Sequence, residues 1–297
     1  MRGLPPPGAH GGDGPAVARA FGLDPREILD LSQSLNPVAP DPTRVVARHL
    51  DALRSYPDPG AATGALAEAI GVDTARVLLT NGGSEAISLL ARVLGGRVRE
   101  PDFSLYPRSP DSAAPLWRSN PHNPSGLLAV PEDSANVWDE AFYPIATASW
   151  TRADPESVVV GSLTKLLACP GLRAGYVLGD PELLARCRRH QPEWSVNGLA
   201  ASALPELLQA VDLPNWALAL KSARAELTAV LEAHGLSPLP SDANWVLVHA
   251  PRLRQRLAPS GVVVRDCASF DMPEFARIAV PSADGIARLD RALTLTD

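Results

Sequence analysis

The chain contains a strand–turn–helix unit that strongly limits its fold. Residues 77–80 predict a short buried strand, Asn81, Gly82 and Gly83 predict a sharp turn, and residues 84–94 predict a helix. Such a unit presents free backbone N–H groups and the positive end of a helix dipole to an anion. The alternative is an ordinary capped turn, because neither a Gly-Lys-Ser/Thr sequence nor a GxGxxG fingerprint is present. The unit indicates an α/β protein with a candidate phosphate site.

A second predicted strand leads to an unusual lysine. Residues 158–160 are three consecutive valines that predict a buried strand, and Lys165 follows them closely. The chain has only two lysines, Lys165 and Lys221, against 25 arginines, and Lys221 falls in an amphipathic helical pattern typical of a solvated charge. A primary amine can attack a carbonyl and form a Schiff base, which a guanidinium cannot do. Lys165 is therefore a candidate for chemistry, with a lysine that reaches from a strand end to solvent as the alternative.

Composition excludes several classes of protein. A chain of 297 residues can form one large α/β unit or two domains. The net charge of −6 argues against a general nucleic-acid surface. The three cysteines fit neither a disulfide framework nor a zinc pattern, so we expect a reducing compartment and no metal. No apolar leader and no long apolar run is present, which favours a soluble, cytoplasmic protein.

The remaining pattern predicts a large domain followed by a smaller one. Residues 1–15 are rich in proline and glycine, and residues 214–234 are the clearest helix. Short strands alternate with helical segments in the last part of the chain, which is typical of an α+β lobe. We expect an N-terminal arm at 1–34 that joins the small domain, a large domain at 35–200 and a small C-terminal domain at 201–297.

Four segments, in this order, resemble the fold-type I pyridoxal-phosphate enzymes of the class I/II aminotransferase superfamily. The likeness extends from His10 to Arg277 and is strongest to threonine-phosphate decarboxylases of cobalamin biosynthesis and histidinol-phosphate aminotransferases. It implies a mainly parallel sheet with helices on both faces, a small α+β domain and pyridoxal 5′-phosphate as cofactor. The segments are Asn81-Gly82-Gly83-Ser84-Glu85, residues 120–126, Asp139-Glu140-Ala141-Phe142, and residues 162–165 with Arg173.

The resemblance implies a role toward the cofactor for nine residues. Lys165 would bond to the cofactor covalently and later move protons at the substrate Cα. Asp139 would pair with the pyridinium nitrogen, Asn123 would bind the 3′ oxygen of the ring, and Phe103 would stack on the ring face. The cofactor phosphate would be bound by residues that follow the two predicted strands at 77–80 and 158–160. In a homodimer with shared sites, a tyrosine of the neighbouring subunit would also bind it. These phosphate ligands are Gly83, Ser84, Ser162, Arg173 and Tyr56.

The resemblance also implies a substrate site for a small phosphorylated amino acid. Arg277 matches the binder of the substrate carboxylate, and Arg265 matches an arginine that reads the substrate phosphate, with a surface arginine as the alternative. His10, in His-Gly-Gly-Asp, matches a phosphate-reaching histidine of the decarboxylases, with a mobile-tail histidine as the alternative. Asn36, in an Asn-Pro turn, is a further candidate for binding the substrate.

The sequence favours the decarboxylase over the aminotransferase. Besides His10, Phe142 stands where many transaminases have a tyrosine, and residues 265–270 look more like the decarboxylase. The implied reaction is decarboxylation of L-threonine O-3-phosphate to (R)-1-amino-2-propanol O-2-phosphate. The alternative is an aminotransferase that acts on histidinol phosphate or a related amino acid.

One region departs from the family pattern. Residues 104–138 are shorter than in relatives, so at least one helix of the large domain is expected to be missing. An exposed sheet edge or cofactor face would then need cover from Trp117, Trp138 or a partner subunit. A trimmed, non-catalytic homologue that binds an anion is therefore an alternative, although Lys165, Asp139 and Arg173 are intact. A dinucleotide oxidoreductase is disfavoured because its glycine fingerprint is absent.

Overall fold

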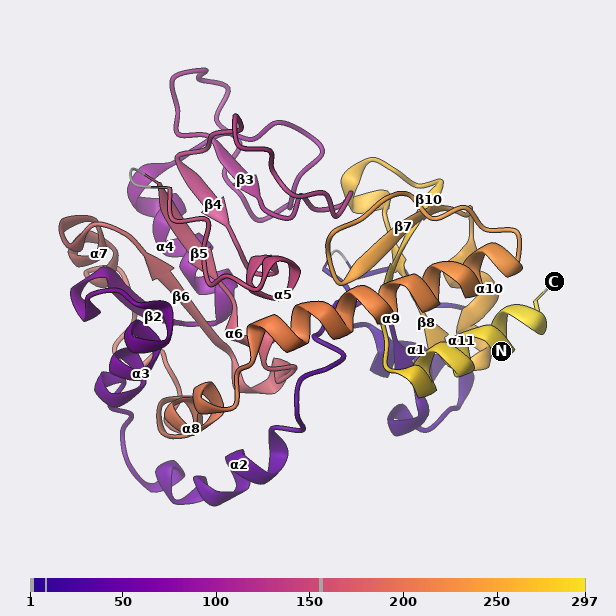
Figure 1. Ribbon diagram of the computed structural model, residues 1–297, viewed down its shortest axis with the longest axis horizontal. Coiled ribbons are helices and arrows are strands. Elements are labelled where there is room, and N and C mark those ends of the chain that lie inside the picture. The colour runs from indigo at the N-terminus through magenta and orange to yellow at the C-terminus, as the bar shows by residue number, and fades with distance from the viewer. Residues whose placement is uncertain (1–2, 9, 155–156, 297) are drawn as a thin grey trace.

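The computed structural model has two lobes joined by one long helix, α9 (Leu213–Ala233) (Figure 1). It describes residues 3–8, 10–154 and 157–296. The larger lobe holds a five-stranded sheet, and the smaller lobe holds a three-stranded and a two-stranded sheet. The elements of the larger lobe are α2 (Thr43–Arg48), α3 (Gly60–Ile70), β2 (Val77–Asn81), α4 (Gly82–Leu94), β3 (Trp117–Ser119), β4 (Val137–Asp139), α5 (Tyr143–Thr147), β5 (Val158–Gly161), α6 (Leu163–Leu166), β6 (Ala174–Leu178), α7 (Pro181–Arg188) and α8 (Gly198–Gln209).

The sheet of the larger lobe has the strand order β2–β6–β5–β4–β3. Strands β3, β4 and β5 pair in parallel, whereas β6 is antiparallel to both β5 and β2. Strand β2 consequently points the same way as β3, β4 and β5. The prediction of a mainly parallel sheet in an α/β fold is confirmed.

Helices cover both faces of this sheet. Leu78 and Val160 pack with α4 on one face, whereas their chain neighbours Leu79 and Val159 pack with α3 and α8 on the other. Because both faces are buried, these strands read as continuous apolar runs in the sequence. This burial explains why residues 77–80 and 158–160 could be recognised as strands.

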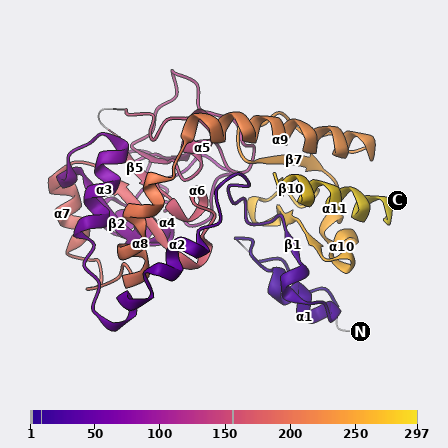
Figure 2. The same cartoon turned by 60° about the horizontal axis from the view of Figure 1, so that its bottom comes forward.

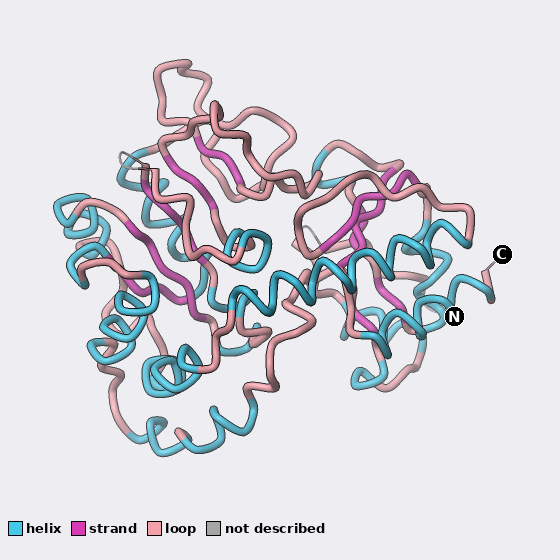
Figure 3. The backbone as a smooth tube through the Cα atoms, viewed as in Figure 1, coloured by secondary structure: helices cyan, strands magenta, loops and turns pink. Residues whose placement is uncertain are grey.

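The part of the larger lobe around β3 is reduced to loops (Figure 3). Strand β3 has three residues, and the pairing on its outer side is a single parallel bridge between Arg97 and Leu116. The connection from β3 to β4 has no helix, although parallel strands are usually joined by one. Trp117 and Trp138 are fully buried in the two cores on opposite faces of the sheet. These indoles therefore fill the interior on either face of the sheet.

The smaller lobe combines the C-terminal part of the chain with the described part of the N-terminal arm. Strand β1 pairs in parallel with β8, and α1 packs on the same unit through Val17 and Val263. The buried Arg254 donates to the carbonyl of Pro5 at 2.9 Å and pairs with Asp13. Figure 2 shows α1 and β1 beside α10 and α11. The elements of this lobe are α1 (Gly14–Phe21), β1 (Leu29–Asp30), β7 (Trp245–His249), α10 (Leu253–Leu257), β8 (Val262–Val263), β9 (Arg265–Asp266), β10 (Phe275–Ala279) and α11 (Ala283–Thr294).

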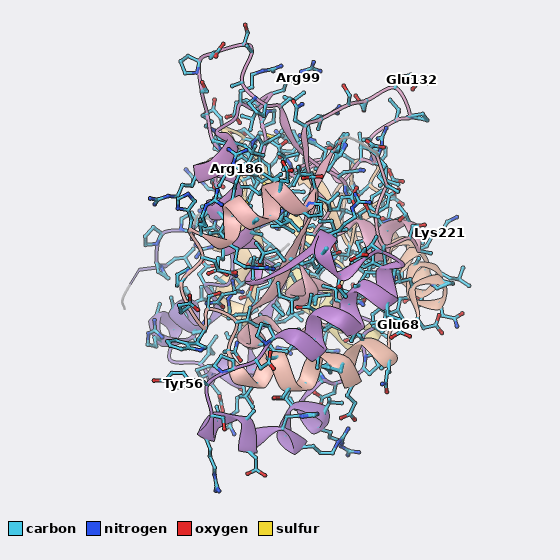
Figure 4. The ribbon with its side chains drawn as sticks, turned by 90° about the vertical axis from the view of Figure 1, so that its left-hand side faces the viewer. Tyr56, Glu68, Arg99, Glu132, Arg186 and Lys221 are labelled. Carbon is cyan, nitrogen blue, oxygen red and sulfur yellow. The ribbon has the colours of Figure 1, made fainter. Side chains whose placement is uncertain are left out.

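The connection between the lobes lies later in the chain than the predicted division at 200/201. That position falls inside α8, which packs against α2 and α3 of the larger lobe. Helix α9 then contacts α5 of the larger lobe and α11 of the smaller one. Lys221 lies exposed on α9, as predicted for a solvated charge (Figure 4). Among the described residues no helix is long and apolar enough to span a membrane.

Candidate active site

A cavity of about 250 Å³ lies where residues of both lobes meet, near the low end of the range for small-molecule sites. It brings together most of the residues predicted from the sequence, although these come from widely separated parts of the chain. The predicted residues that line it are His10, Gly83, Ser84, Phe103, Asn123, Asp139, Ser162, Lys165, Arg173, Arg265 and Arg277.

Lys165 occupies the short helix α6, directly after β5. Its Nζ donates a hydrogen bond to the backbone oxygen of Gln33 at 3.0 Å. Burial, followed by the positive charges of Arg277, Arg173 and Arg265, lowers the pKa of the amine to about 8. The lowered pKa increases the neutral share of the amine near neutral pH, and the neutral form is the one that attacks a carbonyl.

The N-terminus of α4 lines one end of the cavity. Gly83 and Ser84 stand there beside Ser162 and Arg173. Gly82 has φ +76°, and a Cβ at this position would clash with the guanidinium of Arg173. Only glycine combines this backbone conformation with so close an approach. Backbone N–H groups, hydroxyls and a guanidinium thus converge on one point, which suits a phosphate.

Asp139 ends β4 and lines the same cavity. Its Oδ2 accepts a hydrogen bond from the Tyr106 hydroxyl at 2.7 Å, and its Oδ1 accepts from the backbone N–H of Ala141 at 3.0 Å. Burial raises the pKa of the carboxyl to about 6. The ring of Phe103 meets that of Tyr106 edge-on, with centroids 5.6 Å apart. A carboxylate and an aromatic face therefore stand together at the cavity wall.

Arg277 and Asn123 form a buried pair between the lobes. The Nη1 of Arg277 donates to Oδ1 of Asn123 at 2.6 Å, and Asn123 in turn donates its backbone N–H to Oγ of Ser119 at 2.8 Å. The guanidinium lies 4.8 Å from the ring centroid of Trp245. Its buried Nε has no hydrogen-bond partner among the described residues. The guanidinium thus keeps donor capacity for a ligand in the cavity.

Arg265 and His10 line the cavity wall beside Arg277. Arg265 is paired with Arg277 in the register of β9 and β10, and both side chains are buried. The ring of His10 contacts that of Phe103 edge-on, with centroids 5.4 Å apart, and both line the cavity. Burial, with a smaller contribution from Arg265, lowers the pKa of His10. The part of the cavity beside Arg265 and Arg277 therefore suits an anionic ligand.

Two predicted residues lie outside the cavity lining. Tyr56 is 78% exposed and packs against Trp194, with ring centroids 4.5 Å apart (Figure 4). Asn36 is buried and donates its side-chain amide to the backbone oxygen of Leu166 at 2.9 Å, while its own N–H donates to that of Lys165 at 3.1 Å. The structure therefore links Asn36 to the backbone that carries the lysine.

Three residues of the site carry no signal in the sequence. Tyr106 and Ser119 lie in the stretch from 95 to 136, where hydrophobic periodicity is poor, and Gln33 lies in a turn. Their contribution depends on tertiary contacts with Asp139, Asn123 and Lys165. The sequence shows only that a tyrosine follows three residues after Phe103, which does not by itself mark a function.

Comparisons with known proteins agree with this geometry. Histidinol-phosphate aminotransferase 1 of Dechloromonas aromatica is 26% identical over 334 aligned positions that cover 93% of this chain and 92% of the relative. Threonine-phosphate decarboxylase of Salmonella typhimurium is 29% identical and covers 96% of this chain and 95% of the relative. Both alignments are longer than the chain itself, so these relatives contain residues that this chain lacks.

Solved structures and a family model give the same assignment. The histidinol-phosphate aminotransferase of Sinorhizobium meliloti, determined in complex with pyridoxal-5′-phosphate, superposes with a TM-score of 0.80 at 18% identity, covering 95% of this chain and 94% of that one. This likeness concerns the fold. The model for aminotransferase class I and II matches residues 105–293, which is more than half of the chain. The chain thus belongs to the aminotransferase class I and II family, whose members are pyridoxal-phosphate enzymes.

Proposed function

We propose that this enzyme decarboxylates L-threonine O-3-phosphate to (R)-1-amino-2-propanol O-2-phosphate. The observation that carries the proposal is the pairing of two buried arginines, Arg265 and Arg277, on adjacent strands of one cavity wall, with His10 nearby. A substrate with both a carboxylate and a phosphate would neutralise this wall. An amino acid without a phosphate has one anionic group fewer, so it would pair with only one of the two arginines.

The cavity fits pyridoxal phosphate. The turn at the N-terminus of α4, with the hydroxyl of Ser162 and the guanidinium of Arg173, would hold its phosphate. Asp139 would pair with the ring nitrogen, Asn123 would bind the 3′ oxygen, and Phe103 would cover a ring face. When bound, the cofactor supplies an electron sink that stabilises negative charge at the substrate Cα.

The chain's own residues would supply binding, orientation and proton transfer. Arg277 would hold the substrate carboxylate while Arg265 and His10 hold the phosphate, so that the Cα substituents keep one orientation. Lys165, with its lowered pKa, would then give or take a proton at Cα. Which bond breaks at Cα follows from this orientation, and removal of the carboxylate rather than a proton is the outcome that we propose.

Phe142 supports the decarboxylase against the aminotransferase. It lines the cavity and meets the ring of Trp245 edge-on, with centroids 4.7 Å apart. A phenyl ring offers no hydroxyl to the 3′ oxygen that many transaminases contact with a tyrosine. The alternative, transamination of histidinol phosphate or a related amino acid, is favoured by the several aminotransferases among the relatives. A non-catalytic homologue is disfavoured, because Lys165, Asp139 and Arg173 line one cavity.

The proposal includes a cytoplasmic homodimer with shared sites. Tyr56 projects from the surface beside Trp194 and takes no part in the cavity of its own chain. Such an exposed aromatic pair suits a subunit interface. In that assembly the Tyr56 hydroxyl would reach the cofactor phosphate of the neighbouring subunit.

A substrate assay distinguishes the two reactions. Protein loaded with pyridoxal phosphate is supplied with L-threonine O-3-phosphate and no keto acid, and CO₂ release is measured, with Lys165→Ala as the inactive control. We expect CO₂ and an amino-alcohol phosphate. Turnover of histidinol phosphate with 2-oxoglutarate, without CO₂ release from threonine phosphate, would instead establish the aminotransferase.

A further inference from the structure

Tyr106 is hydrogen-bonded to the carboxylate of Asp139, and none of the roles proposed above involves it. It is only 3% exposed, and its hydroxyl donates to Oδ2 of Asp139 at 2.7 Å. The second carboxylate oxygen accepts from the backbone N–H of Ala141. The phenol and that N–H together hold the plane of the carboxylate. Tyr106 also supports Phe103 edge-on, so it contacts two of the residues that would surround the cofactor ring.

The position of Tyr106 is itself fixed by an arginine clamp. Arg108 donates to the backbone oxygens of Tyr106 at 2.7 Å, Ser104 at 3.0 Å and Phe103 at 3.2 Å, and it pairs with Glu100 at 2.6 Å. The ring of Tyr106 also packs against that of Trp117, with centroids 5.6 Å apart. These contacts fix the phenol in a segment without regular secondary structure.

The charges around Asp139 make this hydrogen bond important. Asp102 approaches from the loop before β3, Glu140 is the next residue of the chain, and Tyr176 lies on β6. Burial and the Asp102 carboxylate raise the pKa of Asp139, whereas the Tyr106 hydroxyl lowers it. Burial and the two aspartates in turn raise the pKa of Tyr106 well above its usual value, so the phenol remains a donor at any working pH.

We propose that Tyr106 is a positioning residue that keeps the Asp139 carboxylate ionised and directed into the cavity for the ring nitrogen of the cofactor. This inference rests on the proposed role of Asp139. A hydrogen bond to the charged form of an acid favours that form. Without the phenol, Asp139 would share a buried region with Asp102 and would take up a proton at higher pH.

The first test measures Asp139 in the protein without cofactor. The carboxyl signal of Asp139 is followed by NMR in protein labelled with ¹³C-aspartate, and it is assigned by its loss in Asp139→Asn. We expect Tyr106→Phe to raise the titration midpoint by about one to two pH units. Phenylalanine keeps the ring and its contacts with Phe103 and Trp117. The matched control is Tyr143→Phe, which removes a nearby phenol with no hydrogen bond to Asp139 among those found, and it should leave the midpoint unchanged.

The second test measures pyridoxal phosphate affinity against pH. The affinities of wild type and Tyr106→Phe should agree at high pH and separate as pH falls through the variant's raised midpoint, reaching about tenfold or more. An unchanged midpoint and equal affinities at every pH would overturn the role of Tyr106. If wild type itself does not bind pyridoxal phosphate, the proposed function fails, whereas the NMR midpoint still decides whether the phenol controls Asp139.

Discussion

At the scale of single residues, the site depends on side chains whose charge is altered by burial. Lys165 has a lowered pKa, Asp139 has a raised one, and both line the same cavity. Each shift has desolvation as its main cause, because burial disfavours the charged form of acids and amines alike. Between about pH 6 and 8 the carboxylate is more than half ionised, and the neutral share of the amine rises with pH to about half. This window matches the protonation states that the proposed roles need.

The pKa of Lys165 predicts a pH dependence for cofactor attachment. The rate at which pyridoxal phosphate bonds to the apoprotein should rise with pH and level off above about pH 8, because only the neutral amine reacts. The visible absorption band of the bound cofactor measures the rate. Lys165→Ala should not develop this band, and Lys221→Ala should behave as wild type. A rate that continues to climb to pH 10 would mean that the lysine is not shifted.

Substitution of Arg265 and of Arg277 should affect phosphorylated and unphosphorylated substrates differently. Loss of charged hydrogen bonds of about 1.5–3 kcal/mol predicts that Arg265→Ala lowers kcat/KM for threonine phosphate by about ten- to a hundredfold. The loss on an unphosphorylated analogue should be much smaller. Arg277→Ala should impair both substrates, because both carry the carboxylate. Steady-state kinetics on the two substrates checks this, and an equal loss with Arg265→Ala would remove its phosphate role.

At the scale of elements, Arg152 stabilises the connection between β3 and β4, which contains no helix. The connection from β3 to β4 lacks a helix, and Arg152 binds the carbonyls of Val130 at 3.1 Å and Pro131 at 2.9 Å within it. Arg152 also lies 5.1 Å from the ring centroid of Trp138, with Arg118 at 5.2 Å from the same ring. The carbonyls of this loop thus accept hydrogen bonds from an arginine side chain. In a helix, such carbonyls would accept them from backbone N–H groups of the same helix.

Removing Arg152 should therefore destabilise the protein more than removing a surface arginine. Arg152→Met should lower the free energy of unfolding by about 1–3 kcal/mol, because several carbonyls lose a donor and Trp138 loses a cation–π contact. Arg99→Met is the matched control, since Arg99 is exposed and should change stability by less than about 0.5 kcal/mol (Figure 4). Chemical denaturation measures both. Equal stabilities would show that the loop does not depend on Arg152.

The elements differ in how well the sequence could predict them. Strands β2 and β5 and helix α9 were predictable because continuous apolar runs and helical spacing report burial directly. The site residues were predictable mainly through family motifs, since Asn123 and Arg277 have no local pattern that marks their function. Strand β3 and helix α8 were not predicted: β3 has only three residues, and α8 contains Pro205. Tyr106 was inaccessible because its role exists only through a contact with Asp139 in the folded chain.

At the scale of the whole molecule, the site is divided between two lobes that α9 connects. Lys165 and Asp139 belong to the larger lobe, whereas Arg265 and Arg277 belong to the smaller one. The hydrogen bond from Arg277 to Asn123 joins the lobes directly. The lobes therefore bring the residues proposed for the cofactor and those proposed for the substrate to the same cavity, and a substrate bound there would contact both.

The proposed homodimer predicts complementation between two inactive variants. Tyr56→Ala lacks the residue that would serve the neighbouring site, and Lys165→Ala lacks the lysine of its own site. In a reassociated equal mixture, half of the dimers would be mixed, each with one complete site, so activity should recover toward about a quarter of wild type. Size-exclusion chromatography verifies the dimer. No recovery in a mixture shown to contain mixed dimers would place Tyr56 outside the neighbour's site.

The register of β9 and β10 has a consequence for the size of the substrate. Because Arg265 and Arg277 face each other across an antiparallel pair, their backbones stand only about 5 Å apart and their side chains leave from the same face. Two arginine side chains that leave neighbouring strands from the same face and line one cavity suit a ligand whose two anionic groups lie close together. A compact molecule whose carboxylate and phosphate are a few bonds apart matches this arrangement, and a long dianion would have to fold back on itself to bind.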